Sequence, residues 1–285
     1  MHRPRLTGAA LATTAVVAVG TWSGVSAHAA DAPTASAAAK STITMSGSTS
    51  VAPLARQLAK GYLKAFPGSV RFKLLEGGSD VGINDVSRGR VTIGNSSRDP
   101  QSSDPDGLAF NRIARDGVCI VTHPDNPLGN LSQEQVQQIF SGKVRNWSDV
   151  PGASVSGTID LNVRTQASGT QDAFQNIFMG GPSGPRPATS ASQKASNGLV
   201  QTAVRSNKNA IGYVDFKFTE GTNAVSYKGV ACNLRNAKAG TYPGVRSFWM
   251  VTRGTAKGAT AKFIKWTRTS SAANKIISSN WVALN

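Results

Sequence analysis

The residues whose types and spacing could do chemistry are concentrated in the stretch from Val163 to Phe174. Alternating apolar residues before it predict a half-buried strand, and apolar residues at helical spacing after it predict a helix. Ser168-Gly169-Thr170 would then lie on the first turn of that helix, where unpaired N–H groups and the helix dipole favour an anion. Arg164 beside it can donate two parallel hydrogen bonds to an oxyanion. An ordinary serine or threonine N-cap next to an exposed arginine is the competing interpretation.

Polar turns of the same character recur elsewhere in the chain. The run Ser46–Ser50 follows a predicted strand at 42–45 and precedes a helix whose apolar face carries Val51, Leu54, Leu58, Tyr62 and Phe66. The run Glu76–Gly82 opens a short helix, and its glycines would let backbone N–H groups approach a ligand closely. A third polar turn, Asn95–Asp99, follows the short strand 91–94. These repeated hydroxyl-bearing turns favour anion binding over simple capping.

Strands and helices alternate along the rest of the chain. Further strands are predicted at 118–122, 210–214, 225–227 and 247–251, and further helices after Ser132, at 197–206 and at the C-terminal end. Ser132 with Gln135 three residues later is typical of a capping box. The alternation predicts an α/β fold with a largely parallel sheet.

The N-terminal residues are typical of an export signal. Residues 1–29 combine Arg3 and Arg5, a short apolar run and the small-x-small sequence Ala27-His28-Ala29, which predicts a secretory signal peptide cleaved near Ala29. The Ala/Ser/Thr/Pro-rich segment 30–40 is predicted to be a disordered leader. The mature protein would therefore be secreted or lie on the outside of the cell envelope.

The chain is strongly basic, with a formal net charge of +16. Removing residues 1–29, which hold two arginines and no acidic residue, lowers that charge to +14. Such a surplus favours polyanions or anionic surfaces. The cations are scattered, however, and no run of five or more occurs, so a solvated basic surface is the plainer interpretation and no specific nucleic acid is expected.

Cysteine and histidine usage limits the chemistry available. Export permits a disulfide between Cys119 and Cys232, whereas the apolar surroundings of Cys119 would also suit a buried free thiol. After signal removal His123 is the sole histidine, which argues against a histidine-dependent triad and against a multi-histidine zinc site. No G-x-S-x-G elbow is present, so we expect no enzyme activity. Clustered metal-ligand carboxylates are missing too, and we expect no metal and no cofactor.

Several motifs together resemble one family. Ser46 to Leu54, Gly78-Ser79, Ile93 to Arg98, and Arg164 through Thr170 occur in the order found in the phosphate-binding protein family, the PstS-like substrate-binding components of phosphate ABC importers. Shorter pieces are also similar to family sequences, namely Ala114-Arg115-Asp116-Gly117, Asn126-Pro127, Leu131 to Gln135, Ile139 to Gly142 with Asn146-Trp147, and Ala210 to Tyr213. The resemblance covers nearly all of residues 42–285.

The resemblance implies a type II periplasmic-binding-protein fold, in which two α/β lobes joined by two hinge strands enclose an anion. Lobe one would comprise 41–116 and 246–285, and lobe two 117–245, with the chain crossing near Gly117 and Val245. The implied ligand is inorganic phosphate and the implied partner an ABC transporter permease, with the protein acting as a monomer. The implied ligand-binding residues are Ser48, Thr49, Ser50, Ser79, Ser97, Arg164, Ser168, Gly169 and Thr170.

One departure from the family pattern concerns ligand choice. Many members carry an aspartate where this chain has Ser97, and a carboxylate there accepts the proton of hydrogen phosphate and repels sulfate. A serine hydroxyl both donates and accepts, so it discriminates less. Asp80 or Asp99 could supply the acceptor instead. Another tetrahedral oxyanion, such as sulfate or molybdate, and an extracellular polyanion therefore stay open as alternative ligands.

Overall fold

The computed structural model describes residues 40–284. The predicted signal peptide, its cleavage near Ala29 and all of the predicted leader except Lys40 lie outside the described residues. Between residues 40 and 284, no helix has the length and apolar character needed to span a bilayer.

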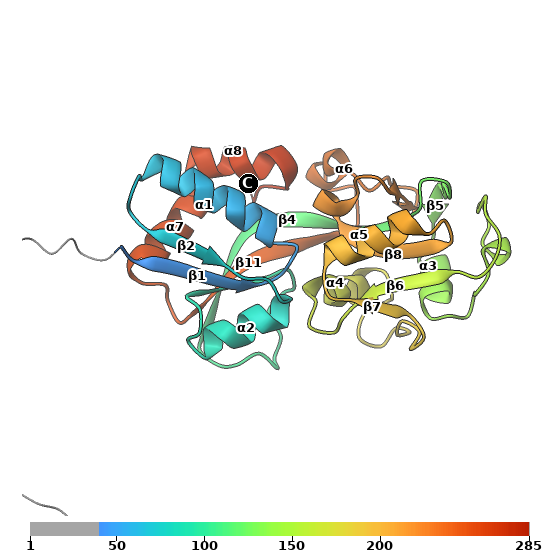
Figure 1. Ribbon diagram of the computed structural model, residues 1–285, viewed down its shortest axis with the longest axis horizontal. Coiled ribbons are helices and arrows are strands. Elements are labelled where there is room, and N and C mark those ends of the chain that lie inside the picture. Colours follow the sequence, from blue (N-terminus) through green and yellow to red (C-terminus); the bar gives the residue numbers. More distant parts are fainter. Residues whose placement is uncertain (1–39, 285) are drawn as a thin grey trace, which may run out of the picture. The chain divides into compact units, whose positions relative to one another are not determined.

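The described chain forms two lobes around separate hydrophobic cores, connected by two long strands (Figure 1). The connecting strands are β4 (Leu108–Thr122) and β11 (Val245–Arg253). Lobe one contains β1 (Thr42–Gly47), α1 (Ala52–Ala65), β2 (Arg71–Leu74), α2 (Ser79–Ser87), β3 (Ile93–Ser96), α7 (Gly258–Thr269) and α8 (Ser271–Asn280). Lobe two contains β5 (Asn130–Leu131), α3 (Gln133–Phe140), η1 (Trp147–Asp149), β6 (Asp160–Arg164), α4 (Gly169–Ile177), β7 (Ser192–Lys194), α5 (Asn197–Ser206), β8 (Ala210–Asp215), η2 (Phe216–Phe218), β9 (Asn223–Ala224), β10 (Ser226–Tyr227) and α6 (Leu234–Lys238).

Local sequence signals explain most of these elements. α1 begins with a proline in its first turn and buries Leu54, Leu58 and Tyr62 against the lobe-one core. Phe66 was predicted to lie on that buried face, but it is the C-cap residue of α1 and stays 46% exposed. Its ring still packs at the edge of the lobe-one core, with its centroid 4.9 Å from that of the Tyr62 ring. In lobe two the capping box predicted at Ser132 and Gln135 is present, with both reciprocal hydrogen bonds.

One continuous sheet runs through both lobes in the order β2-β1-β3-β11-β4-β8-β6-β7. The predicted α/β class is confirmed, but the sheet is mixed rather than largely parallel. β11 runs antiparallel to both β3 and β4, and β4 is antiparallel to β8. A chain that crosses between lobes once and returns once must place these two strands in opposite directions.

The strand β4 is much longer than the predicted 118–122 and changes partner along its length. Leu108 to Gly117 pair with β11, and from Val118 onward the partner is β8. Gly117 lies at the change of partner, where a Cβ atom would come within 2.1 Å of the Phe216 ring. The structure therefore needs glycine at this position for packing.

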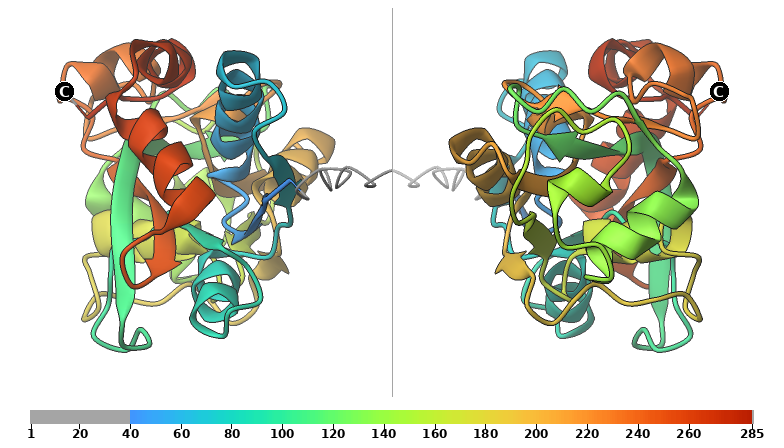
Figure 2. Two further views of the ribbon diagram at one scale, coloured as in Figure 1. Left: turned by 90° about the vertical axis from the view of Figure 1, so that its left-hand side faces the viewer. Right: turned by 90° about the vertical axis from the view of Figure 1, so that its right-hand side faces the viewer.

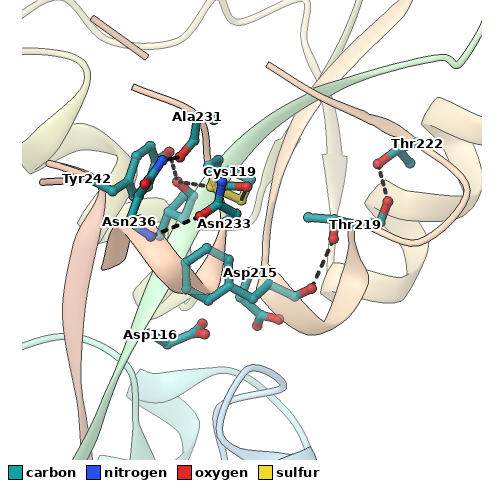
Figure 3. Close-up of a disulfide and its surroundings, with 12 residues drawn as sticks. Asp116, Cys119, Asp215, Thr219, Thr222, Ala231, Asn233, Asn236 and Tyr242 are labelled. Carbon is teal, nitrogen blue, oxygen red and sulfur yellow. Dashed lines mark hydrogen bonds between the residues drawn. A yellow bond between two sulfur atoms is a disulfide. The ribbon is translucent and has the colours of Figure 1, made fainter. Parts of the chain in front are cut away.

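Each lobe has its own core and lobe two has a covalent link. In the lobe-two core the ring of Phe174 stacks on that of Tyr213, and the ring of Phe140 meets Phe174 edge-on. Cys119 on β4 forms a disulfide with Cys232 just before α6 (Figure 3). The sequence left a disulfide and a buried thiol open, and the structure selects the disulfide.

Candidate anion-binding site

The lobe-one part of the site starts at the turn between β1 and α1. Ser48, Thr49 and Ser50 are all buried. Ser48 Oγ accepts hydrogen bonds from the backbone N–H groups of Ser50 (3.2 Å) and Val51 (3.3 Å), so it satisfies donors at the helix start. The buried position of this turn leaves its hydroxyls facing other polar groups rather than water.

Two further lobe-one serines join this turn. Ser48 Oγ donates to Ser97 Oγ over 2.8 Å, and Ser79 Oγ lies 3.3 Å from the same Ser97 oxygen. Ser79 is the first residue of α2, and it also accepts a hydrogen bond from the Ser97 backbone N–H (3.0 Å). Helix starts of α1 and α2 and the end of β3 therefore meet at one cluster of hydroxyls.

The lobe-two part begins where β6 ends and α4 starts, as predicted. Ser168 is the N-cap of α4, and its Oγ accepts from the backbone N–H groups of Thr170 (3.1 Å) and Gln171 (3.3 Å). Gly169 lies so close to lobe one that a Cβ atom would be 2.3 Å from Ser79 Oγ and 2.7 Å from Ser97 Oγ. Any side chain here would push the lobes apart.

Arg164 is hydrogen-bonded to two backbone carbonyls and points toward the hydroxyls of both lobes. Its Nε donates to Lys194 O (3.1 Å) and its Nη2 to Ala195 O (2.9 Å). The same Nη2 lies 3.3 Å from Thr49 Oγ1, and Nη1 lies 3.4 Å from Thr170 Oγ1. Burial lowers the pKa of Arg164 to about 10, which leaves the guanidinium charged at neutral pH.

Direct contacts between hydroxyls of the two lobes close the site. Ser50 Oγ and Thr170 Oγ1 are 2.9 Å apart, and Asn197 Nδ2 donates to Ser50 Oγ (2.8 Å) and Thr49 Oγ1 (3.2 Å). The structure thus brings together every sequence-predicted site residue, namely Ser48, Thr49, Ser50, Ser79, Ser97, Arg164, Ser168, Gly169 and Thr170. Their role as anion ligands stays a prediction.

Four other residues at this cluster were not singled out from the sequence. They are Asp116 on β4, Asn197 at the start of α5, Asp215 at the end of β8 and Arg246 on β11. Each is buried, and Arg246 Nη1 and Nη2 donate to Thr170 Oγ1 (2.9 Å) and Ser50 Oγ (2.8 Å). The available signals were the position of Asp116 beside the expected hinge at Gly117 and of Arg246 beside the one at Val245.

The electrostatics around these residues are unusual. Burial is the main cause that raises the pKa of both Asp116 and Asp215, the latter to about 6. Burial also lowers the pKa of Arg246, and the two nearby aspartates only partly offset this effect. The cluster therefore combines two guanidiniums, which attract an oxyanion, with two carboxyl groups that resist ionisation.

The alternative acceptors suggested for a protonated anion are engaged elsewhere. Asp80 Oδ1 accepts from Arg98 Nε (2.7 Å), and Asp99 Oδ1 accepts from Trp249 Nε1 (3.0 Å). Neither carboxylate is hydrogen-bonded to the hydroxyl cluster, so the interpretation of either one as the ligand's acceptor is not supported by the geometry. In the described part of the chain no group of three or more histidine, cysteine, aspartate or glutamate side chains could hold a metal ion.

Comparisons with known proteins identify what this chain is similar to. Residues 32–270 match a family model described as the PBP superfamily domain. A phosphate-binding protein PstS from Bacillus subtilis (strain 168) is 28% identical over 244 residues, which span 84% of this chain and 79% of that relative. The family resemblance seen in the sequence is confirmed.

Solved structures agree with that match. A putative phosphate ABC transporter substrate-binding protein with bound phosphate, from Clostridium perfringens, has a TM-score of 0.79 and 29% identity, covering 86% of this chain and all of that one. An ABC-type phosphate transport receptor from Vibrio cholerae has a TM-score of 0.68 and 28% identity over 85% of this chain and 100% of its own. The two-lobed periplasmic-binding-protein fold implied by the resemblance is therefore confirmed.

Proposed function

We propose that this chain, which belongs to the PBP superfamily domain family, captures inorganic phosphate between its two lobes and releases it chemically unchanged. The observation that carries the proposal is the contact of hydroxyls from both lobes with Arg164 and Arg246 at one buried cluster. Relatives of similar length are phosphate-binding proteins, and one was solved with phosphate bound. A buried dianion is stable only when most of its lone pairs receive hydrogen bonds, and these groups can supply them.

Titration calorimetry tests this proposal directly. The protein is first unfolded, dialysed free of carried-over anion and refolded with its disulfide intact. We expect saturable binding of one phosphate per chain, with a rise in melting temperature that grows with phosphate concentration. Sulfate, molybdate and arsenate are titrated in parallel, because Ser97 makes selectivity the open part of the proposal. Stripped protein that gives no heat with phosphate but binds sulfate or molybdate would reassign the ligand.

Capture is proposed to involve closure of the two lobes onto each other. Lobe one comprises residues 41–116 and 246–285, lobe two comprises residues 117–245, and the chain crosses between them near Gly117 and Val245. The partner change of β4 at Gly117 and the cross-lobe contacts of Gly169 support this division. Small-angle scattering should give a smaller radius of gyration with phosphate than without it. Identical scattering curves at saturating phosphate would remove lobe closure from the account.

The cellular role follows by analogy. Relatives named as a phosphate-binding protein PstS and as an ABC-type phosphate transport receptor support hand-over of phosphate to an ABC transporter permease. The protein is proposed to act there as an exported monomer, and the signal-like residues 1–29 support the export. Mass spectrometry of the protein from culture medium should find an N-terminus at or near Ala30, as expected for cleavage near Ala29. Catalysis is not part of the proposal, and a chromogenic phosphate ester should remain uncleaved.

A second candidate function, binding of an extracellular polyanion, is favoured by one specific feature. All acidic residues of the chain precede residue 221, so α7 and α8 contain none, and neither does α1. These three helices pack against one another in lobe one, as the left-hand view of Figure 2 illustrates. Their exposed cations are Arg56, Lys60, Lys64, Lys262, Lys265, Arg268 and Lys275.

Heparin retention measured against salt concentration tests this second function. Lys262→Ala with Lys265→Ala should reduce retention, whereas the control pair Arg88→Ala with Arg90→Ala at the end of α2 should reduce it less. Phosphate binding should be unchanged in both double variants. Equal retention in the two variants would indicate net charge alone rather than a binding face.

A further inference from the structure

Arg246 differs from Arg164 in where it is anchored. It lies on the connecting strand β11, directly opposite Asp116 of β4 in the antiparallel register. Its side chain is only 4% exposed. Nη1 donates to Thr170 Oγ1 (2.9 Å) and Ser97 Oγ (3.3 Å), and Nη2 donates to Ser50 Oγ (2.8 Å). The strand pair that connects the lobes thus carries a guanidinium whose Nη atoms face the hydroxyls of both.

Two carboxyl groups lie behind this guanidinium at a distance too long for hydrogen bonds. Asp116 Oδ2 and Asp215 Oδ2 are each 3.8 Å from the same atom, Arg246 Nη2. Within residues 40–284, neither carboxyl oxygen of Asp116 has a hydrogen-bond partner. Asp215 is better satisfied, because it accepts from Asn197 Nδ2 (3.0 Å) and from the Lys217 backbone N–H (3.2 Å). Figure 3 shows both aspartates beside the disulfide region of lobe two.

The charges that face this pair come from several elements. Arg246 of β11 and Arg164 of β6 favour ionised carboxylates, whereas Asp116 and Asp215 oppose each other. Asp172 of α4 acts on Arg246, and Tyr213 of β8 acts on Arg164. Burial raises the pKa of both Asp116 and Asp215 even before an anion binds. A dianion among the hydroxyls would add negative charge near the pair and offset the attraction of the Arg246 guanidinium, so it would favour the protonated form of the pair.

We propose that anion capture at this site is coupled to proton uptake by the Asp116–Asp215 pair, and that Arg246 transmits the coupling. In this step the anion accepts hydrogen bonds from the Nη atoms of Arg246. One proton from solvent or buffer then forms an O–H bond with a carboxyl oxygen of the pair, and no covalent bond in the protein breaks. The inference rests on the proposed capture of phosphate and concerns the same site.

The direction of the pH effect follows from linkage. When binding takes up protons, the affinity falls as pH rises, by up to about tenfold per pH unit for one proton. Phosphate itself titrates near neutral pH, so its own protons contribute to any single measurement. That contribution is the same for two protein variants compared at one pH, and it cancels in their difference.

The test is titration calorimetry with inorganic phosphate in buffers of different ionisation enthalpy between pH 6 and 8. The slope of the observed enthalpy against the buffer's ionisation enthalpy gives the number of protons exchanged. Wild type is compared with Asp116→Asn, which removes one titrating group while keeping the shape of the side chain. Asp215→Asn is the second variant in case the first does not fold. Asp104→Asn is the matched control, since Asp104 is also an aspartate paired with a buried arginine.

We expect wild type and Asp104→Asn to take up more protons than Asp116→Asn or Asp215→Asn, by an amount approaching one. The Kd of wild type relative to either pair variant should then rise with pH, by up to about tenfold per unit. Equal proton counts in wild type and the pair variants, with phosphate still bound, would overturn the coupling and leave the proposed function intact. Absence of phosphate binding by wild type would instead remove the proposed function.

Discussion

Two regions of this molecule place one buried arginine between two aspartates, with opposite electrostatic results. In lobe one, Arg98 donates from Nε to Asp80 (2.7 Å) and from both Nη atoms to Asp104 (2.5 and 3.1 Å). At the connecting strands, Arg246 lies 3.8 Å from Asp116 and from Asp215 and donates to hydroxyls instead. The residue types are the same, and the geometry differs.

The difference appears in the protonation of the groups. The hydrogen bonds around Arg98 raise its pKa and lower that of Asp104, although burial opposes both shifts. Around Arg246 burial prevails, which raises the pKa of both aspartates and lowers that of the arginine. A bidentate arginine–carboxylate pair has its donors satisfied, whereas Arg246 keeps its charge directed at the site. The comparison distinguishes a structural ion pair from a guanidinium available to a ligand.

The largest expected effect on stability comes from removing the arginine of the first region, Arg98. Arg98→Ala leaves Asp104 with its partner removed at a largely buried position and should lower the free energy of unfolding by about 3–5 kcal/mol. Arg246→Ala should cost less, because Asp116 and Asp215 can become neutral instead of remaining as unpaired charges. Urea denaturation of both variants at pH 7 measures the difference. Equal losses would show that the two clusters serve the fold alike.

The next effect concerns affinity. Arg164→Ala should weaken phosphate binding by about 1.5–3 kcal/mol, because a hydrogen-bonding charge is removed from the buried site. Arg186→Ala, which removes an exposed guanidinium from the same lobe, is the control and should leave the affinity nearly unchanged. Calorimetry measures both. Full affinity in Arg164→Ala would place the ligand away from this arginine.

The two regions should also differ in the pH dependence of stability. Asp215 has a folded-state pKa of about 6, above its unfolded value, so its contribution is present below about pH 4 and is lost as pH rises to 6. Asp104 has a lowered pKa, so its contribution is present above about pH 4 and is lost as pH falls below that value.

Denaturation curves from pH 2 to 8 for Asp215→Asn and Asp104→Asn should therefore deviate from wild type with opposite slopes. The Asp215 deviation should reach at most about 3 kcal/mol, since one pKa unit corresponds to about 1.4 kcal/mol. Parallel curves for the two variants would contradict the contrast between the regions.

The smallest expected effect comes from an exposed ion pair, which serves as a reference for the buried ones. Arg56 pairs with Glu76 on the surface of lobe one, and its side chain is 56% exposed. Arg56→Ala should change the free energy of unfolding by less than about 1 kcal/mol, because solvent and side-chain entropy offset an exposed pair. A loss of unfolding free energy as large as that of Arg98→Ala would contradict the argument that burial makes the Arg98 ion pairs more important for stability than this exposed pair.

Local patterns and the family resemblance predicted much of this structure. The helix at 197–206 has the expected bounds, and the turn from Arg164 to Thr170 leads into α4 as expected. The predicted site residues converge because they lie at strand ends and helix starts, which sheet topology gathers at one edge. Phe66 was placed wrongly, since periodicity does not show where a helix face leaves the core.

The rest depended on long-range contacts that a local pattern does not carry. Arg246 and Asp116 face each other only through the register of β11 and β4, and their sequence positions are far apart. Residues 108–117 mix apolar and polar side chains without a clear alternation, which concealed the first two thirds of β4. The disulfide was undecided because an apolar environment suits both a thiol and a bridge, and only the distance between Cys119 and Cys232 decides.

A crystal structure grown with phosphate after removal of carried-over anion tests the central claim most directly. The account predicts one phosphate ion between the lobes, within hydrogen-bonding distance of Ser50, Thr170 and both guanidiniums of Arg164 and Arg246. Phosphate bound on the outer surface would contradict this account. So would a phosphate that contacts Arg164 while Arg246 still donates only to the hydroxyls.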